Sequence, residues 1–132
     1  MRKSNSVKIL LMVSGVIGGA VGGALLVSPV AFEASAGIKL GDNISLLSEI
    51  RSSGGAILST GFIVLWGAFV PKLRYVALLL STSFYLSYGL SRVFSMVVDG
   101  LPNESLVVVT AFEIIIGTIS FILFQKQKKI VN

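Results

Sequence analysis

The sequence predicts an all-α membrane protein, a bundle of four transmembrane helices folded as one domain over residues 1–132. Hydrophobic residues make up 54% of the chain and the mean hydropathy is +0.91, well above what an ordinary soluble domain needs. These residues gather in four blocks, each close to the ~20 residues that cross the hydrocarbon core of a bilayer. Because lipid offers the backbone no hydrogen bonds, such blocks have to be helical. We expect helices over about residues 7–28, 46–70, 75–98 and 104–125.

The first expected helix, 7–28, contains a ladder of glycines. Gly15, Gly19 and Gly23 recur at four-residue spacing, and small residues repeated in this way let helices approach closely in lipid. We expect the ladder to pack against another helix of the chain, with homodimerisation as the alternative. A secretory signal peptide is a rival interpretation, since basic residues precede the segment and Ala-Ser-Ala follows at 34–36. The apolar stretch 9–27 exceeds the ~7–15 residues of a signal peptide, so we expect the helix to be retained.

The second expected helix, 46–70, begins with charged residues and glycines. Glu49 and Arg51 lie two residues apart, about 200° around a helix, so only one of them can point into the bundle. Gly54 and Gly55 follow directly. Because they lack side chains, they leave space beside the charges for another helix or a small molecule.

The third and fourth expected helices, 75–98 and 104–125, each carry a polar seam. On the third helix, spacings of three and four place on one face Ser81, Tyr85, Tyr88, Arg92, Ser95 and Asp99. The fourth offers Thr110, Glu113, Gly117 and Ser120. An ionisable side chain within a membrane costs roughly 3 kcal/mol or more, so it usually has a partner or a function. We expect the seams to face each other and Arg92 to pair with Glu113.

The connections contain turn and capping residues. Pro71 ends the second helix because proline cannot donate the next backbone hydrogen bond. Asp42 or Asn43 is expected to cap the second helix, and Asn103 to cap the fourth. The segment 28–48 is the only long connection and is expected on the outer side.

The distribution of basic residues predicts the orientation. Eight of the eleven Lys and Arg residues lie at the two termini and in the turn between the second and third helices: Arg2, Lys3, Lys8, Lys72, Arg74, Lys126, Lys128 and Lys129. The positive-inside rule makes that side cytoplasmic, so both termini face inward. Membrane headgroups also explain the net charge of +5 better than nucleic acid does, and we expect no nucleic-acid partner.

The composition limits the chemistry. Without cysteine or histidine, the chain lacks thiolate nucleophiles, the usual zinc and haem ligands and the Ser-His-Asp arrangement. We therefore assign no catalytic residues, no metal and no cofactor, and an enzyme is the least favoured class. In that class Glu49 or Glu113 would be the general acid or base.

Several segments resemble one family. They are 48–55 with Gly61, the turn 71–74, the run 89–100 and the lone Glu113. Together they resemble a bacterial membrane family catalogued as domain of unknown function 4345, over nearly the whole chain. More remotely, a Glu followed by paired glycines is similar to the DoxX-like four-helix proteins. The resemblance implies a multi-pass bacterial inner-membrane protein and no particular activity.

Two functions are compatible with these sequence features. In the first, Glu49, Arg51, Arg92, Asp99 and Glu113 form a buried charge network, and the protein is structural or an accessory subunit of a membrane complex. In the second, an outward-facing pocket between the second, third and fourth helices binds or transports a small apolar or amphipathic ligand. Such a ligand would be lipid or quinone-like, with Tyr85 and Tyr88 as walls. The expected partners are the bilayer and either a second copy or another membrane protein.

Overall fold

The computed structural model describes residues 2–131, and side chains from residue 5 to residue 128. The side chains of Arg2, Lys3 and Lys129 lie outside these residues. Over the described range the chain forms five α-helices and one 3-10 turn, with no strand. The elements are α1 (Arg2–Val27), α2 (Pro29–Ser35), α3 (Ile44–Phe69), η1 (Pro71–Leu73), α4 (Arg74–Asp99) and α5 (Glu104–Val131). The all-α prediction is confirmed, and α2 is an additional helix within the long connection.

Local chemistry explains where the long helices begin. Asn43 is the N-cap of α3, since its side-chain Oδ1 accepts a hydrogen bond from the Leu46 N–H at 3.1 Å. Asn103 does the same at the start of α5, where its Oδ1 accepts from the Ser105 N–H at 3.0 Å. Pro71 follows the end of α3 and opens η1. Of the two capping candidates before α3, the structure therefore selects Asn43.

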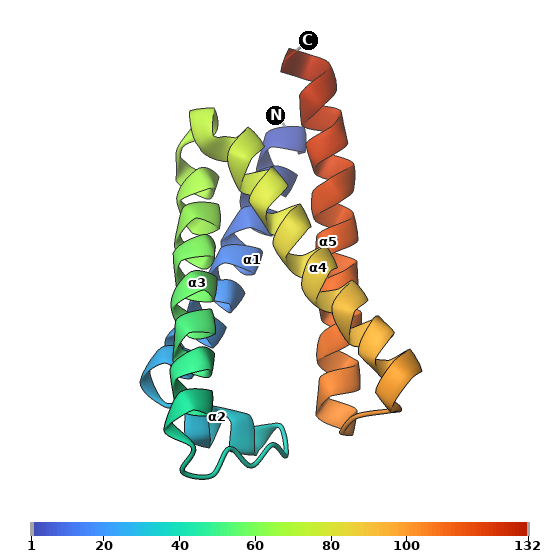
Figure 1. Ribbon diagram of the computed structural model, residues 1–132. Coiled ribbons are helices and arrows are strands. Elements are labelled where there is room, and N and C mark those ends of the chain that lie inside the picture. Colours follow the sequence, from blue (N-terminus) through green and yellow to red (C-terminus); the bar gives the residue numbers. More distant parts are fainter. Residues whose placement is uncertain (1, 132) are drawn as a thin grey trace.

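The long helices form two antiparallel pairs. α1 packs chiefly against α3 and α4 against α5, while α3 meets α4 near η1. Figure 1 shows both termini and η1 at one end of the molecule, with α2 at the other end. The apolar core lies at the η1 end, where the two pairs meet, and comprises Val7, Leu11, Val64, Ala68, Ala77 and Leu78. Toward α2 the two pairs spread apart (Figure 1).

Glycines set the close approach of α1 to α3. A Cβ added at Gly15 would lie 2.6 Å from the Leu65 backbone nitrogen, and one at Gly22 only 2.3 Å from that of Leu58. A Cβ on Gly54 would lie 2.7 Å from the backbone nitrogen of Leu26. These contacts leave no room for any side chain. Gly15 and Gly54 therefore lie at the α1–α3 contact.

The Cβ positions of three other glycines point away from the contacts between helices of this chain. A Cβ on Gly19, Gly23 or Gly55 would meet nothing within 4 Å. A helix turns every 3.6 residues, so each four-residue step drifts by about 40°. Gly23 has therefore rotated away from the α3 contact, whereas the steps of three and four from Gly15 through Gly18 to Gly22 stay on it.

Three helices, and not the expected four, are long and apolar enough to cross a membrane in the described part of the chain. Their spans are Asn5–Val27, Ile44–Phe69 and Glu104–Lys128. α4 matches them in length but not in composition, because its middle is crowded with polar side chains: Ser81, Thr82, Ser83, Tyr85, Ser87, Tyr88, Ser91 and Arg92.

Candidate functional site

A cavity of about 660 Å³ lies between the two helix pairs. α1 and α3 form one wall, α4 and α5 the other, and α2 with the chain after it lines one end. The walls are mainly aliphatic and aromatic. Volumes of roughly 300–1,000 Å³ with a few polar groups are typical of small-molecule sites. The charged residues among its lining are Glu33, Arg92 and Glu113.

The main polar feature is an ion pair between α4 and α5. The Nε of Arg92 lies 3.1 Å from Oε2 and 3.4 Å from Oε1 of Glu113. The Glu113 side chain is 13% exposed and the Arg92 side chain 33%. The predicted pairing is therefore confirmed. It forms because both residues sit about two to three turns from the short α4–α5 connection and so reach the same depth.

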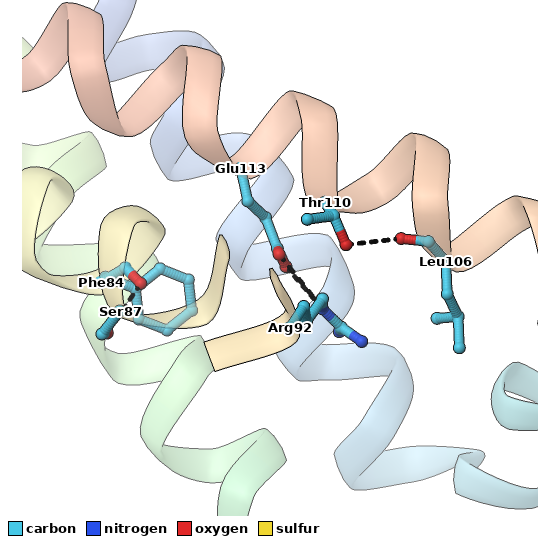
Figure 2. Close-up of polar contacts among 6 residues, drawn as sticks. All are labelled: Phe84, Ser87, Arg92, Leu106, Thr110 and Glu113. Carbon is cyan, nitrogen blue, oxygen red and sulfur yellow. Dashed lines mark hydrogen bonds and ion pairs between the residues drawn. The ribbon is translucent and has the colours of Figure 1, made fainter. Parts of the chain in front are cut away.

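Arg92 has hydrogen-bonding capacity left over. Both of its bonds to Glu113 use Nε, and within residues 5–128 its terminal nitrogens donate to no other group. Figure 2 shows the tip of the guanidinium directed away from the Glu113 carboxylate. A guanidinium carries five N–H donors, so the site retains a fork of donors at the cavity wall.

Aromatic side chains surround the pair. The Tyr88 ring centroid lies 6.0 Å from the Arg92 guanidinium carbon, at the outer limit of a cation–π contact. Phe84 packs between Tyr85 and Tyr88, with ring centroids 5.2 and 4.9 Å away. Phe84 and both tyrosines line the cavity.

The two tyrosine hydroxyls differ. The Tyr85 hydroxyl donates to the Ser14 carbonyl of α1 at 2.5 Å, so Tyr85 anchors α4 to α1. The Tyr88 hydroxyl forms no hydrogen bond within the described residues. Of the two, only Tyr88 has a hydroxyl proton that is free to donate to a ligand.

The polar faces of α4 and α5 also meet at a second place, although not every polar residue on them bonds across the two helices. The hydroxyls of Ser81 and Ser120 lie 2.9 Å apart across the buried α4–α5 contact. Thr110 does not bond across helices, because its hydroxyl donates to the Leu106 carbonyl of its own helix at 2.7 Å (Figure 2). The seams therefore face each other at two levels, the serine pair near the core and the ion pair at the cavity.

The five-residue charge network is not formed. Arg51 donates to the carbonyls of Leu26 and Val27, the last of α1, and so holds that helix end. Asp99 accepts from Ser95 of its own helix at 2.9 Å. Glu49 is exposed. None of these three charged residues lines the cavity. For Arg51 the reason is the close α1–α3 contact, which turns its side of α3 toward α1.

Glu33 was missed by the sequence analysis. It belongs to α2, is half-buried and lines the cavity, yet it falls in a segment expected to be irregular. Proline at the first position of a helix favours helix initiation, and Pro29 occupies that position in α2. The Ser28-Pro29 pair was thus the available signal. Among the described residues, no three Asp or Glu side chains gather closely enough to hold a metal ion.

Fold and site together define a helical protein with three membrane-span-like helices and an apolar cavity containing a paired arginine and glutamate. The family model described as Domain of unknown function (DUF4345) matches residues 6–124, and the chain belongs to this family. Comparisons with curated proteins and with solved structures found no match. The remote resemblance to DoxX-like proteins therefore stays a prediction.

Proposed function

We propose that the protein crosses the bacterial inner membrane four times with both ends in the cytoplasm, and that it binds a lipophilic small molecule between its helix pairs. The single observation that carries the binding proposal is the position of the Arg92–Glu113 pair on the wall of the 660 Å³ cavity. Small-molecule sites combine such apolar walls with a few convergent polar groups.

α4 is the fourth span of this proposal. α3 and α5 are both apolar enough to cross a membrane, and they run in the same direction with α4 between them (Figure 1). A chain that crosses twice in one direction has to return between the crossings. The polar groups of α4 are compatible with this position because several bond to neighbouring helices rather than facing lipid.

The charge distribution supports the orientation. Lys8, Lys72, Arg74, Lys126 and Lys128 lie at the end of the molecule that holds both termini and η1 (Figure 1). The acidic residues outside the ion pair belong to the opposite half: Glu33, Asp42, Glu49, Asp99 and Glu104. Lys and Arg beside short loops favour the cytoplasmic side.

A purely structural role is the second candidate, favoured by the mutual neutralisation of Arg92 and Glu113. The protein would then be a scaffold or an accessory subunit of a membrane complex. An ion pair with a purely structural role is expected to be enclosed by packed side chains. Good geometry and additional hydrogen bonds can then offset the free energy lost when both charges leave water. The open donors of Arg92 beside a cavity fit ligand binding better.

Native mass spectrometry of protein extracted gently from its own membrane tests the proposal. Val109 lines the cavity, and its neighbour Val108 is 50% exposed and does not. Val109→Trp should obstruct the cavity and abolish a co-purifying small molecule, whereas the matched Val108→Trp should retain it. Absence of any bound molecule in the wild-type protein, or equal retention by both variants, would favour the structural role.

A further inference from the structure

We infer that the ligand is a single-chain amphiphile with an uncharged hydroxyl or carbonyl head, held at Arg92 and Glu113, with its chain leaving between α1 and α5. This inference rests on the proposed binding function and narrows the class of ligand. It follows from the charge of the cavity, the donors and acceptors at the pair, the depth of the pair and the exposed part of the lining.

The charge of the cavity disfavours a charged head. Arg92 and Glu113 neutralise each other at 3.1 Å, and the remaining charged residue of the lining is Glu33. A charged head at the pair would meet one member of its own charge, Glu113 for an anion and Arg92 for a cation, and it could attract the other member only by competing with the existing ion pair. Interactions of like charge count strongly where water is scarce.

The hydrogen-bonding groups suit a hydroxyl or carbonyl. Arg92 offers its terminal nitrogens as donors, and the Tyr88 hydroxyl is also without a partner in the described residues. Glu113 offers a carboxylate that accepts. A hydroxyl can donate to that carboxylate while it accepts from the guanidinium, and a carbonyl can accept from Arg92 and Tyr88.

The depth of the pair restricts the size of the head. Arg92 lies about two helical turns, or ~10 Å, inside the outer end of α4 at Asp99. In the proposed membrane position, the surroundings at this depth are hydrocarbon. A compact head can reach the pair, whereas the glycerophosphate portion of a diacyl lipid stays at the water interface.

The exposed part of the lining indicates where the chain lies. Ile17 of α1 and Val109 and Phe112 of α5 line the cavity yet remain 40%, 40% and 60% exposed. These exposed lining residues favour a path for the chain between α1 and α5, which the proposed membrane position puts at the depth of the acyl chains. These two helices contact each other little.

The outer end of the cavity is covered. Phe32 of α2 and the chain that follows line it, and Gly37 lies against the Asn103 side chain at the start of α5, where an added Cβ would be 2.6 Å from Nδ2. The chain after α2 thus bridges to the α4–α5 connection on the side away from η1. The lateral opening faces lipid, so an amphiphile enters from the bilayer rather than from water.

A quenching experiment with bromine-labelled chains tests the inference. Trp66 is the only tryptophan and does not line the cavity, so Trp66→Phe gives a dark background. Phe112→Trp then reports from the cavity mouth. Phe121→Trp reports from the surface of α5, since Phe121 is 44% exposed and outside the lining. The probes are 9,10-dibromostearyl alcohol, the corresponding sulfate and the corresponding trimethylammonium, added to protein in phosphatidylcholine nanodiscs.

The alcohol should quench the Phe112→Trp reporter saturably and the Phe121→Trp control only in proportion to its mole fraction. Apparent affinities of the sulfate and the ammonium should be at least about tenfold weaker. The double variant Arg92→Leu/Glu113→Leu should lose this preference, so that the three probes bind alike.

A charged probe that binds as tightly as the alcohol, or more tightly, overturns the head class and leaves the binding proposal intact. Equal, non-saturable quenching of both reporters by all probes overturns both. If the reporters fold poorly, thermal unfolding of the wild-type protein gives the second measurement. Stearyl alcohol should then raise the melting temperature more than stearyl sulfate or stearyl trimethylammonium, and the reverse order overturns the inference.

Discussion

Removing Arg92 alone should cost far more stability than removing both members of the Arg92–Glu113 pair. Truncation of one partner in a buried ion pair typically costs ~3–5 kcal/mol, whereas exchange of both for apolar groups is often near neutral. In Arg92→Leu the Glu113 carboxylate is stranded at 13% exposure with no other cation among the cavity residues. We expect a loss of about 3 kcal/mol in the free energy of unfolding.

Glu113→Leu should be milder. Arg92 is already 33% exposed, and a long arginine side chain can extend toward a polar surface when its partner is lost. We expect a loss of about 1–2 kcal/mol for this variant, since arginine inserted in a helix centre costs only ~2.5–3.5 kcal/mol before such relief.

The double variant Arg92→Leu/Glu113→Leu should lie within about 1–2 kcal/mol of the wild type, which gives a coupling energy of about 3 kcal/mol, the upper end of the usual range. Reversible unfolding in mixed micelles measures all four proteins. Glu49→Leu is the control, because Glu49 is exposed and lines no cavity, and it should change stability by less than about 0.5 kcal/mol. Single effects that simply add would refute the assigned interaction between α4 and α5.

Two further predictions concern the packing of α1 against α3 and the orientation in the membrane. Gly22→Leu should strongly reduce the folded yield, because even a Cβ at this position would lie 2.3 Å from the Leu58 backbone nitrogen. Gly23→Leu should leave the yield and the melting temperature unchanged, because a Cβ there would meet nothing within 4 Å. A loss of folded protein in both variants would contradict the α1–α3 packing. For the orientation, the chain has no cysteine, so single cysteines at positions 43 and 103 should react with an impermeant thiol reagent in intact cells and one at position 127 should not. Labelling at position 127 alone would reverse the proposed topology.

The helices were predictable because their causes are local. Long apolar blocks, Asn43, Pro71 and Asn103 place most helix ends within two residues of the structure. The α4–α5 seam was predictable for a related reason: spacings of three and four residues put side chains on one face whatever the neighbours are. Arg92 then meets Glu113 because the short connection fixes the relative height of the two helices.

What sequence could not supply is the rotation of each helix about its own axis. Gly15 and Gly23 look equivalent in a four-residue ladder, yet only Gly15 faces α3, because the drift of the ladder matters only once the partner is known. Arg51 looked like a member of the charge network for the same reason, and it instead holds the end of α1. The contribution of Glu33 depended on α2, whose seven residues are too few to give a periodic signal.

α4 connects these observations, since the helix least suited to lipid is the one that carries the site. Three of its polar side chains bond to neighbouring helices, one after another from the core outward. Ser81 contacts Ser120 of α5, Tyr85 donates to the Ser14 carbonyl of α1, and Arg92 pairs with Glu113 of α5. The first two contacts are buried and closed, and they hold α4 between the pairs. At the third the pairs have already spread apart, so the same seam that binds the helices together near η1 reaches the cavity with donors unused. One amphipathic helix thereby provides both the attachment of the α4–α5 pair to α1 and the polar end of the proposed binding site. The change from helix contact to cavity lies between Tyr85 and Tyr88.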